Sequence, residues 1–387
     1  MQTVYLDNSA TTPLDELVLE SMRPYLTREF GNPSSIHSWG QRARSTVEDA
    51  RAQVAELIGA DTNEIVFTSG GTESNNTALR GVATRNLSKG NHIITTTIEH
   101  SAVLRTCEQL EKEGFRLSYL PVDHQGLLCL GHLKEAIEKE TILISIMQAN
   151  NEIGSIQPIG DIAALAKESG IFFHTDAVQA VGKIPMDVHK LEIDLFSLSA
   201  HKFHGPKGIG ALFVKRGTVM DPLMRGGSHE RNRRAGTLNV AGIVGLGKAC
   251  ELAHTALKDL NSRVCSLRDK LETGILEKIP GTVVNGSTIH RLPHLTNISF
   301  CDLEGEALLI SLDLQGIAVS TGSACSSGAI EPSHVLSALG IAPKLRKSAI
   351  RFSLSRINTE EDIDYVLQTL LQIVERMREI APLYRAR

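Results

Sequence analysis

Two residues of this 387-residue chain, Asp176 and Lys202, have side chains whose types and spacing suit cofactor chemistry. Each lies at the end of an apolar run, IFFHTDAV (171–178) for the aspartate and LFSLSAHK (195–202) for the lysine. A lysine amine forms Schiff bases with aldehydes, and a carboxylate keeps an aromatic ring nitrogen protonated. Pyridoxal phosphate needs both groups, so the pair predicts a site for it. The alternatives are a surface lysine in a turn and an aspartate that caps the turn after a strand.

Seven apolar, β-branched segments predict the strands that would position this pair. They are residues 65–69, 92–98, 116–122, 141–147, 171–177, 195–200 and 210–215. Stretches of helical length and period alternate with them, which predicts a largely parallel sheet covered by helices on both faces. Ligands of such sheets bind beyond the carboxyl ends of the strands, where Asp176 and Lys202 are expected to lie.

A change of pattern after Pro280 predicts a second, smaller unit, because shorter strand segments alternate with helical pieces from there on. The helical stretch before it suits a connection between two domains. We expect an α/β protein with three layers, in which residues 16–259 form a large cofactor-binding domain around a mostly parallel sheet. Residues 1–15 and 260–387 are expected to form a smaller α/β domain that carries Cys325.

The sequence TSGGTESNN (68–76) follows one of the predicted strands and precedes a helical stretch. Gly71 lets a ligand approach the backbone closely, Thr72 offers a hydroxyl, and the free amides at a helix start bind phosphate. The segment does not match the GxxxxGK[ST] pattern, so a nucleoside-triphosphate loop is not favoured. It predicts the place of the cofactor phosphate, although many helix starts look similar.

Two polar residues, His100 and Asn151, follow further strands at the same expected edge. A histidine there can stack on a flat ring or transfer protons, and an asparagine can hydrogen-bond the ring. Both have structural alternatives, since a histidine at a strand end is often structural and asparagine is common in ordinary turns.

Cys325 lies in STGSACSSGAIEPSHV (320–335), a stretch of small, turn-forming residues without apolar periodicity. Such a cysteine is accessible and is a candidate nucleophile. At a reference pKa of about 8.5, only a few per cent of a thiol is ionised near neutral pH, so the site must assist its ionisation. The alternative is an incidental loop cysteine. Arg351, in the apolar segment AIRFSLS, has a guanidinium fork that would fit the carboxylate of a substrate.

Composition and charge argue against several classes of protein. The formal net charge is −4 and the basic clusters are short, so we expect no nucleic-acid binding. The longest apolar runs have the length of strands, which predicts no membrane span, and the amino terminus shows no secretion signal. The six cysteines lack CxxC and Cys/His spacing, so structural zinc is not expected. Free thiols suit a reducing cytoplasm, where we expect the protein to work.

Nine motifs occur in order over nearly the full chain: LDNSATT, GNPSSIH, TSGGTESNN, EHSAV, ANNEIG, HTDAVQAVGKIP, SAHKFHGPKGIG, RRAGTLNV and STGSACSSG. Together they resemble the cysteine desulfurases of the IscS/NifS type, in the class V branch of fold-type I pyridoxal-phosphate enzymes. The resemblance implies the fold-type I architecture, pyridoxal 5'-phosphate as cofactor, and a homodimer with cofactor sites near the subunit interface. It also implies L-cysteine as substrate and L-alanine as product.

The resemblance further implies roles for individual residues around the cofactor. Lys202 would hold the cofactor as a Schiff base, Asp176 would face the pyridine nitrogen, and His100 would stack on the ring and help proton transfer. Asn151 and Gln179 would bond the side of the ring that carries the phenolic oxygen. The phosphate would be held by Gly71, Thr72, Ser199 and His201. Thr237 of the partner subunit would complete its binding site.

On the substrate side, the resemblance implies that Asn151 and Arg351 contact L-cysteine, with Arg351 gripping its carboxylate. The Cys325 thiolate would attack the substrate sulfur and become a persulfide. That sulfur would pass to an iron–sulfur scaffold protein of the IscU/NifU type, and Cys325 would transiently act as a ligand of the metal cluster through its persulfide.

Two alternatives to a desulfurase stay open. One is a selenocysteine lyase, or another pyridoxal-phosphate-dependent C–S lyase or aminotransferase, which would need no cysteine nucleophile such as Cys325. The other is a non-enzymatic sulfur carrier, which would not need the pair of Asp176 and Lys202. The long segment after Cys325 resembles the branch of the family that hands sulfur directly to scaffolds. Relatives often carry alanine at the position of Gly71, a departure that we expect to change little.

Overall fold

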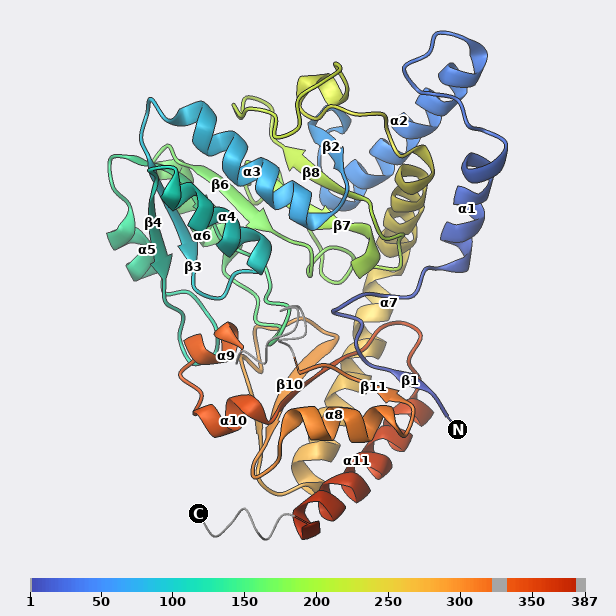
Figure 1. The fold of residues 1–387 in the computed structure, drawn as a ribbon, viewed down its shortest axis with the longest axis vertical. Helices are drawn as coiled ribbons and strands as arrows, with labels where there is room; N and C mark the ends of the chain where they lie inside the picture. The colour runs from blue at the N-terminus through green and yellow to red at the C-terminus, as the bar shows by residue number, and fades with distance from the viewer. Residues whose placement is uncertain (1, 322–332, 381–387) are drawn as a thin grey trace.

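The computed structural model describes residues 2–321 and 333–380, apart from the side chains of residues 258–261 (Figure 1). Its larger part is built on a seven-stranded sheet in the order β2-β8-β7-β6-β5-β3-β4. The strands are β2 (Ile65–Thr68), β3 (His92–Thr96), β4 (Arg116–Leu120), β5 (Thr141–Ser145), β6 (Phe172–Asp176), β7 (Leu195–Ser199) and β8 (Gly210–Val214). Each lies within one of the seven segments predicted from the sequence.

The direction of the strands creates one functional edge. All neighbouring pairs are parallel except those of β8, which runs antiparallel to both β2 and β7. The prediction of a mostly parallel sheet is therefore confirmed. Because β8 lies between β2 and β7 and opposes both, the strands β2 to β7 all have their carboxyl ends at the same edge.

Helices cover both faces of this sheet. The helices of the larger part are α1 (Glu16–Thr27), α2 (Ser38–Ile58), α3 (Gly71–Asn86), α4 (Ser101–Lys112), α5 (Leu130–Ala136), α6 (Ile159–Glu168) and the first half of α7 (Val240–Lys278). Successive residues of a strand point to opposite faces, and the neighbours Val66 and Phe67 of β2 do so here. Val66 packs in the core under α3 and α4, whereas Phe67 packs in the core under α2, α6 and α7. The result is the expected three-layer α/β arrangement.

The smaller part combines two small sheets with further helices. The strands β12-β10-β9 form an antiparallel sheet, and β1 pairs with β11 in parallel. The strands are β1 (Val4–Tyr5), β9 (Thr282–Val284), β10 (Leu295–Phe300), β11 (Ile317–Ala318) and β12 (Ala349–Ser353). The helices are α8 (Gly305–Asp313), α9 (His334–Ala338), α10 (Pro343–Lys347) and α11 (Glu360–Ile380).

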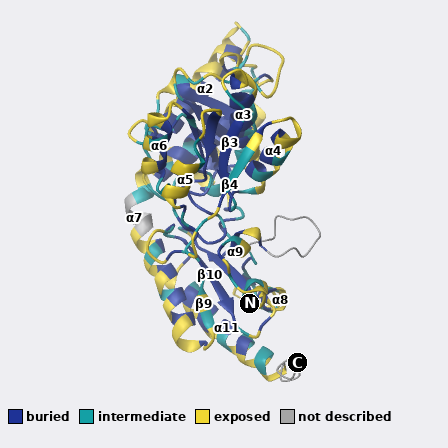
Figure 2. Cartoon of the chain, turned by 90° about the vertical axis from the view of Figure 1, so that its left-hand side faces the viewer, coloured by how far each residue is buried: buried dark blue, intermediate teal, exposed yellow. Residues whose placement is uncertain are grey.

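Helix α7 is common to both parts. Its first half contributes Ile243 and Leu246 to the core under the large sheet, and its second half contributes Leu271 and Ile275 to the core of the smaller part. Figure 2 shows these buried cores one above the other, with α7 running alongside both. The domain boundary expected at residues 259/260 falls inside this helix. Within the described residues, no helix combines the length and the apolar character needed to cross a bilayer.

Candidate active site

Asp176 and Lys202 both lie at the common carboxyl edge of the sheet. Asp176 is the buried last residue of β6, and Lys202 ends the short 3₁₀ turn η2 (Ala200–Lys202) that follows β7. The strands β6 and β7 are direct neighbours in the sheet. The predicted pairing of a carboxylate and an amine on adjacent strand ends is therefore present in the structure.

The Asp176 carboxylate is held by two hydrogen bonds. Its Oδ2 accepts from Asn75 Nδ2 at 2.6 Å, and its Oδ1 accepts from the backbone amide of Val178 at 3.0 Å. The second bond is the turn-capping contact considered as the alternative, and the contact of Asp176 with a cofactor stays a prediction. Asn75 lies one turn into α3, and its role was not predicted from the sequence. A buried carboxylate that is fixed this way is ready to face a cationic ring nitrogen.

The amine of Lys202 is held by the amino-terminal segment of the chain. Lys202 Nζ donates to the carbonyl oxygens of Ser9 at 2.7 Å and Ala10 at 2.8 Å. The same segment is tied to the turn after β7, because the Thr12 amide donates to the His201 carbonyl at 2.9 Å. The motif LDNSATT thus covers the lysine, a function that local sequence patterns do not reveal.

The start of α3 forms the wall of an open pocket of about 410 Å³. Four residues predicted to hold phosphate line this pocket, namely Gly71, Thr72, Ser199 and His201. Gly70, the residue before the helix, has a φ of 148°, a conformation that favours glycine. Lys207 also lines the pocket and was not predicted to do so. Free helix-start amides beside hydroxyl groups and a lysine make this pocket suited to a phosphate group.

Gly71 packs closely against Val178. A Cβ atom on this residue would lie 2.6 Å from Cγ2 of Val178, which is too short for van der Waals contact. An alanine here therefore requires the Val178 side chain to move, and the expectation that glycine at this position changes little stays a prediction.

The histidines of the site are uncharged near neutral pH. Burial, together with the positive charges of Lys202, Lys207 and Lys183, lowers the pKa of His201 to about 4. His201 Nδ1 lies 3.2 Å from Thr11 Oγ1. Without a bound anion the ring is therefore neutral, and it is available to hydrogen-bond a phosphate.

His100 has a structural role at the start of a helix. It precedes α4, and its Nδ1 accepts the Ala102 amide at 3.1 Å, which is a structural cap. Burial is the main cause that lowers the pKa of His100, so the ring is neutral near pH 7. With Nδ1 accepting, the proton of the neutral ring is on Nε2. The cap fixes the ring, and stacking on the cofactor ring and proton transfer by His100 stay predictions.

Arg351 lies buried on β12 beside Asn151. Its Nη1 donates to the Asn151 carbonyl at 2.8 Å, and its Nη2 donates to Asp7 Oδ1 at 2.6 Å. The carboxylate that a buried guanidinium requires is thus Asp7 in this structure. Arg351 Nε is buried and has no hydrogen-bond partner among the described residues. The guanidinium is in place at the site, and its contact with a substrate carboxylate remains a prediction.

The remaining predicted residues divide into three cases. Gln179 is buried and donates from Nε2 to the Ser9 carbonyl at 2.9 Å, which places it next to Lys202. Thr237 is exposed and does not line the pocket at α3 of its own chain. Cys325 lies outside the described residues, so its roles as nucleophile and as cluster ligand stay predictions.

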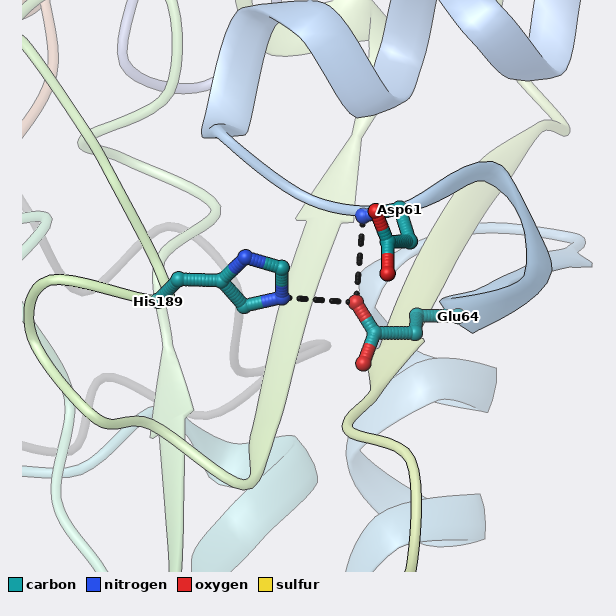
Figure 3. A group of neighbouring side chains, drawn as sticks. All are labelled: Asp61, Glu64 and His189. Atoms are coloured by element: carbon teal, nitrogen blue, oxygen red, sulfur yellow. Dashed lines mark hydrogen bonds and ion pairs between the residues drawn. The ribbon is translucent and has the colours of Figure 1, made fainter.

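A group of possible metal ligands lies at the opposite edge of the sheet, before β2 (Figure 3). Ligand atoms of Asp61, Glu64 and His189 lie within 4.8 Å of one another. Glu64 Oε2 accepts from the Asp61 amide at 3.1 Å and from His189 Nε2 at 2.8 Å, and Oε1 accepts from the Arg216 amide at 2.8 Å. These hydrogen bonds satisfy the buried Glu64 carboxylate, which thereby connects three loops of the structure.

Comparison with known proteins agrees with this geometry. The family model described as aminotransferase class-V matches residues 4–366, and the chain therefore belongs to that family. A curated relative named cysteine desulfurase IscS, from Methanosarcina thermophila, is 53% identical over 382 residues, covering 99% of this chain and 94% of the relative.

Solved structures give the same result. A structure titled NifS-like protein superposes with a TM-score of 0.92 at 41% identity, covering 97% of this chain and 100% of the other. A structure titled SspA in complex with cysteine has a TM-score of 0.81 at 38% identity, covering 91% of this chain and 99% of the other. The resemblance to the IscS/NifS type of cysteine desulfurase is thereby confirmed, and with it the fold-type I architecture and pyridoxal phosphate as cofactor.

Proposed function

We propose that this protein is a cysteine desulfurase, which takes sulfur from L-cysteine and releases L-alanine. The observation that carries the proposal is the placement of Asp176 and Lys202 on adjacent strand ends, at the sheet edge where the pocket at the start of α3 also lies. The curated relatives named cysteine desulfurase, and the solved SspA structure that contains cysteine, support the same activity.

Pyridoxal phosphate, once bound, supplies the electron sink for loss of the substrate α-proton. Asp176, oriented by Asn75, would hold a proton on the ring nitrogen. The amides at the start of α3 and the Ser199 hydroxyl would bind the phosphate, with His201 as a neutral partner. Lys202 Nζ and His100 Nε2 are the groups that would carry protons at this edge.

On the substrate side, the Arg351 guanidinium would bind the carboxylate of L-cysteine, with Asn151 beside it. The Cys325 thiolate would form an S–S bond with the substrate sulfur while the C–S bond breaks. The electron pair of that bond stays with the carbon fragment, which takes up protons and leaves as L-alanine. The sulfur remains on Cys325 as a persulfide, for transfer to an iron–sulfur scaffold protein of the IscU/NifU type.

The sulfur transfer predicts a specific result for Cys325→Ala. This variant should keep the yellow colour of the bound cofactor and lose release of sulfide from L-cysteine in the presence of a thiol reductant. Mass spectrometry of the wild-type protein after addition of L-cysteine should find one extra sulfur atom on Cys325. Cys129→Ala, which changes an exposed thiol elsewhere in the chain, is the matched control and should behave like wild type. Full sulfide release by Cys325→Ala would instead favour a C–S lyase without a cysteine nucleophile.

We further propose that two copies of the chain form a homodimer. Apolar side chains of Phe30, Ile36 and Trp39 are exposed around the connection between α1 and α2, which projects from one corner of the molecule (Figure 1). Exposed apolar groups of this size favour an interface. Thr237 is also exposed and would complete the phosphate site of the second copy.

Thr237→Ala should therefore weaken retention of pyridoxal phosphate by about 10- to 100-fold, because a hydrogen bond to a charged phosphate contributes about 1.5–3 kcal/mol. Equilibrium dialysis measures this affinity, and light scattering measures the native mass. Thr62→Ala changes an exposed threonine at the opposite edge and should leave the affinity unchanged. Unaltered retention by a dimeric Thr237→Ala protein would remove Thr237 from the site.

Two further proposals concern the cellular compartment of the protein and the boundaries of its domains. We place the enzyme in the cytoplasm, which is supported by the unpaired state of the cysteines at positions 107, 129, 250, 265 and 301. The division into residues 16–259 and residues 1–15 with 260–387 is supported by the separate cores on either side of the middle of α7.

A further inference from the structure

A second lysine, Lys183, lies at the site and has no part in the mechanism above. It follows β6 and lines a small cavity of about 60 Å³ that Lys202 and His294 also line. None of the ion pairs found among the described residues includes Lys183. Burying an amine without a carboxylate partner costs folding free energy. The contacts of Lys183 therefore indicate its role.

Lys183 forms a hydrogen bond with Gln179. Lys183 Nζ donates to Gln179 Oε1 at 3.1 Å, and Gln179 Nε2 donates to the Ser9 carbonyl at 2.9 Å. The same carbonyl accepts Lys202 Nζ at 2.7 Å. A continuous set of hydrogen bonds therefore runs from Lys183 through Gln179 and Ser9 to Lys202.

These contacts determine the orientation of the Gln179 amide. The two ends of a glutamine amide have nearly the same shape, so its neighbours decide which end is oxygen and which is nitrogen. The Ser9 carbonyl can only accept, and it fixes the nitrogen on the side of Lys202. The Lys183 amine donates at the other end, and it fixes the oxygen there. Without Lys183, the Gln179 oxygen would lose this donor, and only the bond to the Ser9 carbonyl would hold the amide.

Burial and the charges of Lys202 and Arg351 lower the pKa of Lys183 well below its ordinary value. The donor function does not depend on this, because a neutral amine and an ammonium group both carry N–H donors. An amine of weak basicity also suits a site that holds two other cations, since it adds little charge beside them.

We propose that Lys183 is a positioning residue for the cofactor, which acts by holding the Gln179 amide so that its nitrogen faces the Lys202 side of the site. The inference rests on the proposed function, in which Gln179 bonds the phenolic oxygen side of the cofactor ring. It assigns to Lys183 a role through Gln179 and not a direct contact with the substrate.

The test is a double-mutant cycle on the intact enzyme loaded with pyridoxal phosphate. Lys183→Met keeps an unbranched side chain that is one atom shorter, and it removes the donor. We expect it to weaken cofactor affinity by about 2- to 10-fold, the range that one net hydrogen bond gives, and to shift the visible absorption band of the bound cofactor. In the Gln179→Ala background, Lys183→Met should have no further effect on either quantity.

Two further variants make the result specific. Lys183→Gln, which retains an N–H donor, should recover part of the affinity, and it also serves if Lys183→Met does not fold. Lys190→Met changes an exposed lysine a few residues away and should leave affinity and spectrum unchanged. An undiminished effect of Lys183→Met in the Gln179→Ala background would overturn the proposal, because Lys183 would then act independently of Gln179. A wild-type spectrum in Lys183→Met would overturn it as well.

The proposed function is tested separately in the same samples. Formation of L-alanine from L-cysteine by the wild-type enzyme reports on the desulfurase activity, whereas affinity and spectrum of the variants report on Lys183. A wild-type enzyme that forms alanine, together with variants that have unchanged spectra, would reject only the role of Lys183.

Discussion

Lys202→Ala is expected to lower the rate of L-alanine formation by at least about 10³-fold. The variant loses both the amine that links covalently to the cofactor aldehyde and a proton carrier at the reacting carbon, and a positioned acid–base group alone contributes about 10²–10⁴-fold. The absorption band of the covalently held cofactor should be absent as well. Steady-state kinetics and visible spectroscopy measure the two effects.

The controls for Lys202→Ala follow from the contacts of the amine. Its removal leaves the Ser9 and Ala10 carbonyls without this donor, which we expect to cost about 1–3 kcal/mol of the free energy of unfolding. Circular dichroism and a denaturant titration should therefore accompany the kinetics, to show that the fold is retained. Lys167→Ala, at an exposed position on α6, should behave like wild type. A wild-type cofactor spectrum in Lys202→Ala would refute the assignment.

Asp176→Asn is expected to lower kcat by about 10²- to 10⁴-fold while cofactor still binds. The neutral amide cannot hold a proton on the ring nitrogen, and removing one partner of a buried charge pair costs about 3–5 kcal/mol, or about two to four powers of ten in rate. The position of the cofactor band and the kinetics of alanine release check this expectation.

Asn75→Ala separates orientation from charge at Asp176. It removes the 2.6 Å hydrogen bond to Oδ2 and keeps the carboxylate, so its effect on kcat should be clearly smaller than that of Asp176→Asn. Equal losses in the two variants would mean that orientation, and not charge, is what Asp176 contributes.

The sheet was predictable from sequence because its strands are continuous apolar, β-branched runs separated by helical patterns. For the same reason, the residues that end these strands were predicted at one edge, and Asp176, Lys202 and His100 are found there. The antiparallel direction of β8 was not predicted, because an apolar run does not indicate whether a strand pairs parallel or antiparallel with its neighbours.

The contacts that complete the site depend on residues far apart in the chain. Ser9 meets Lys202, and Asp7 meets Arg351, across sequence separations of 193 and 344 residues. No local period or spacing links such positions, so the cover over Lys202 and the carboxylate beside Arg351 appear only in three dimensions. Asn75 was missed for a different reason, because within TSGGTESNN it is an ordinary polar residue of a helix start. Only the hydrogen bond from Asn75 to Asp176 in the folded protein shows that Asn75 belongs to the site.

Helix α7 has a consequence for the way the protein unfolds. A helix of 39 residues is about 58 Å long, and its two halves are packed in different cores. Because a helix gains most of its stability from packing, loosening either core would leave half of α7 without support and weaken the turns that continue into the other. The two parts of the chain should thus melt in one cooperative transition, and damage far from the cofactor would still lower the temperature at which the site is lost.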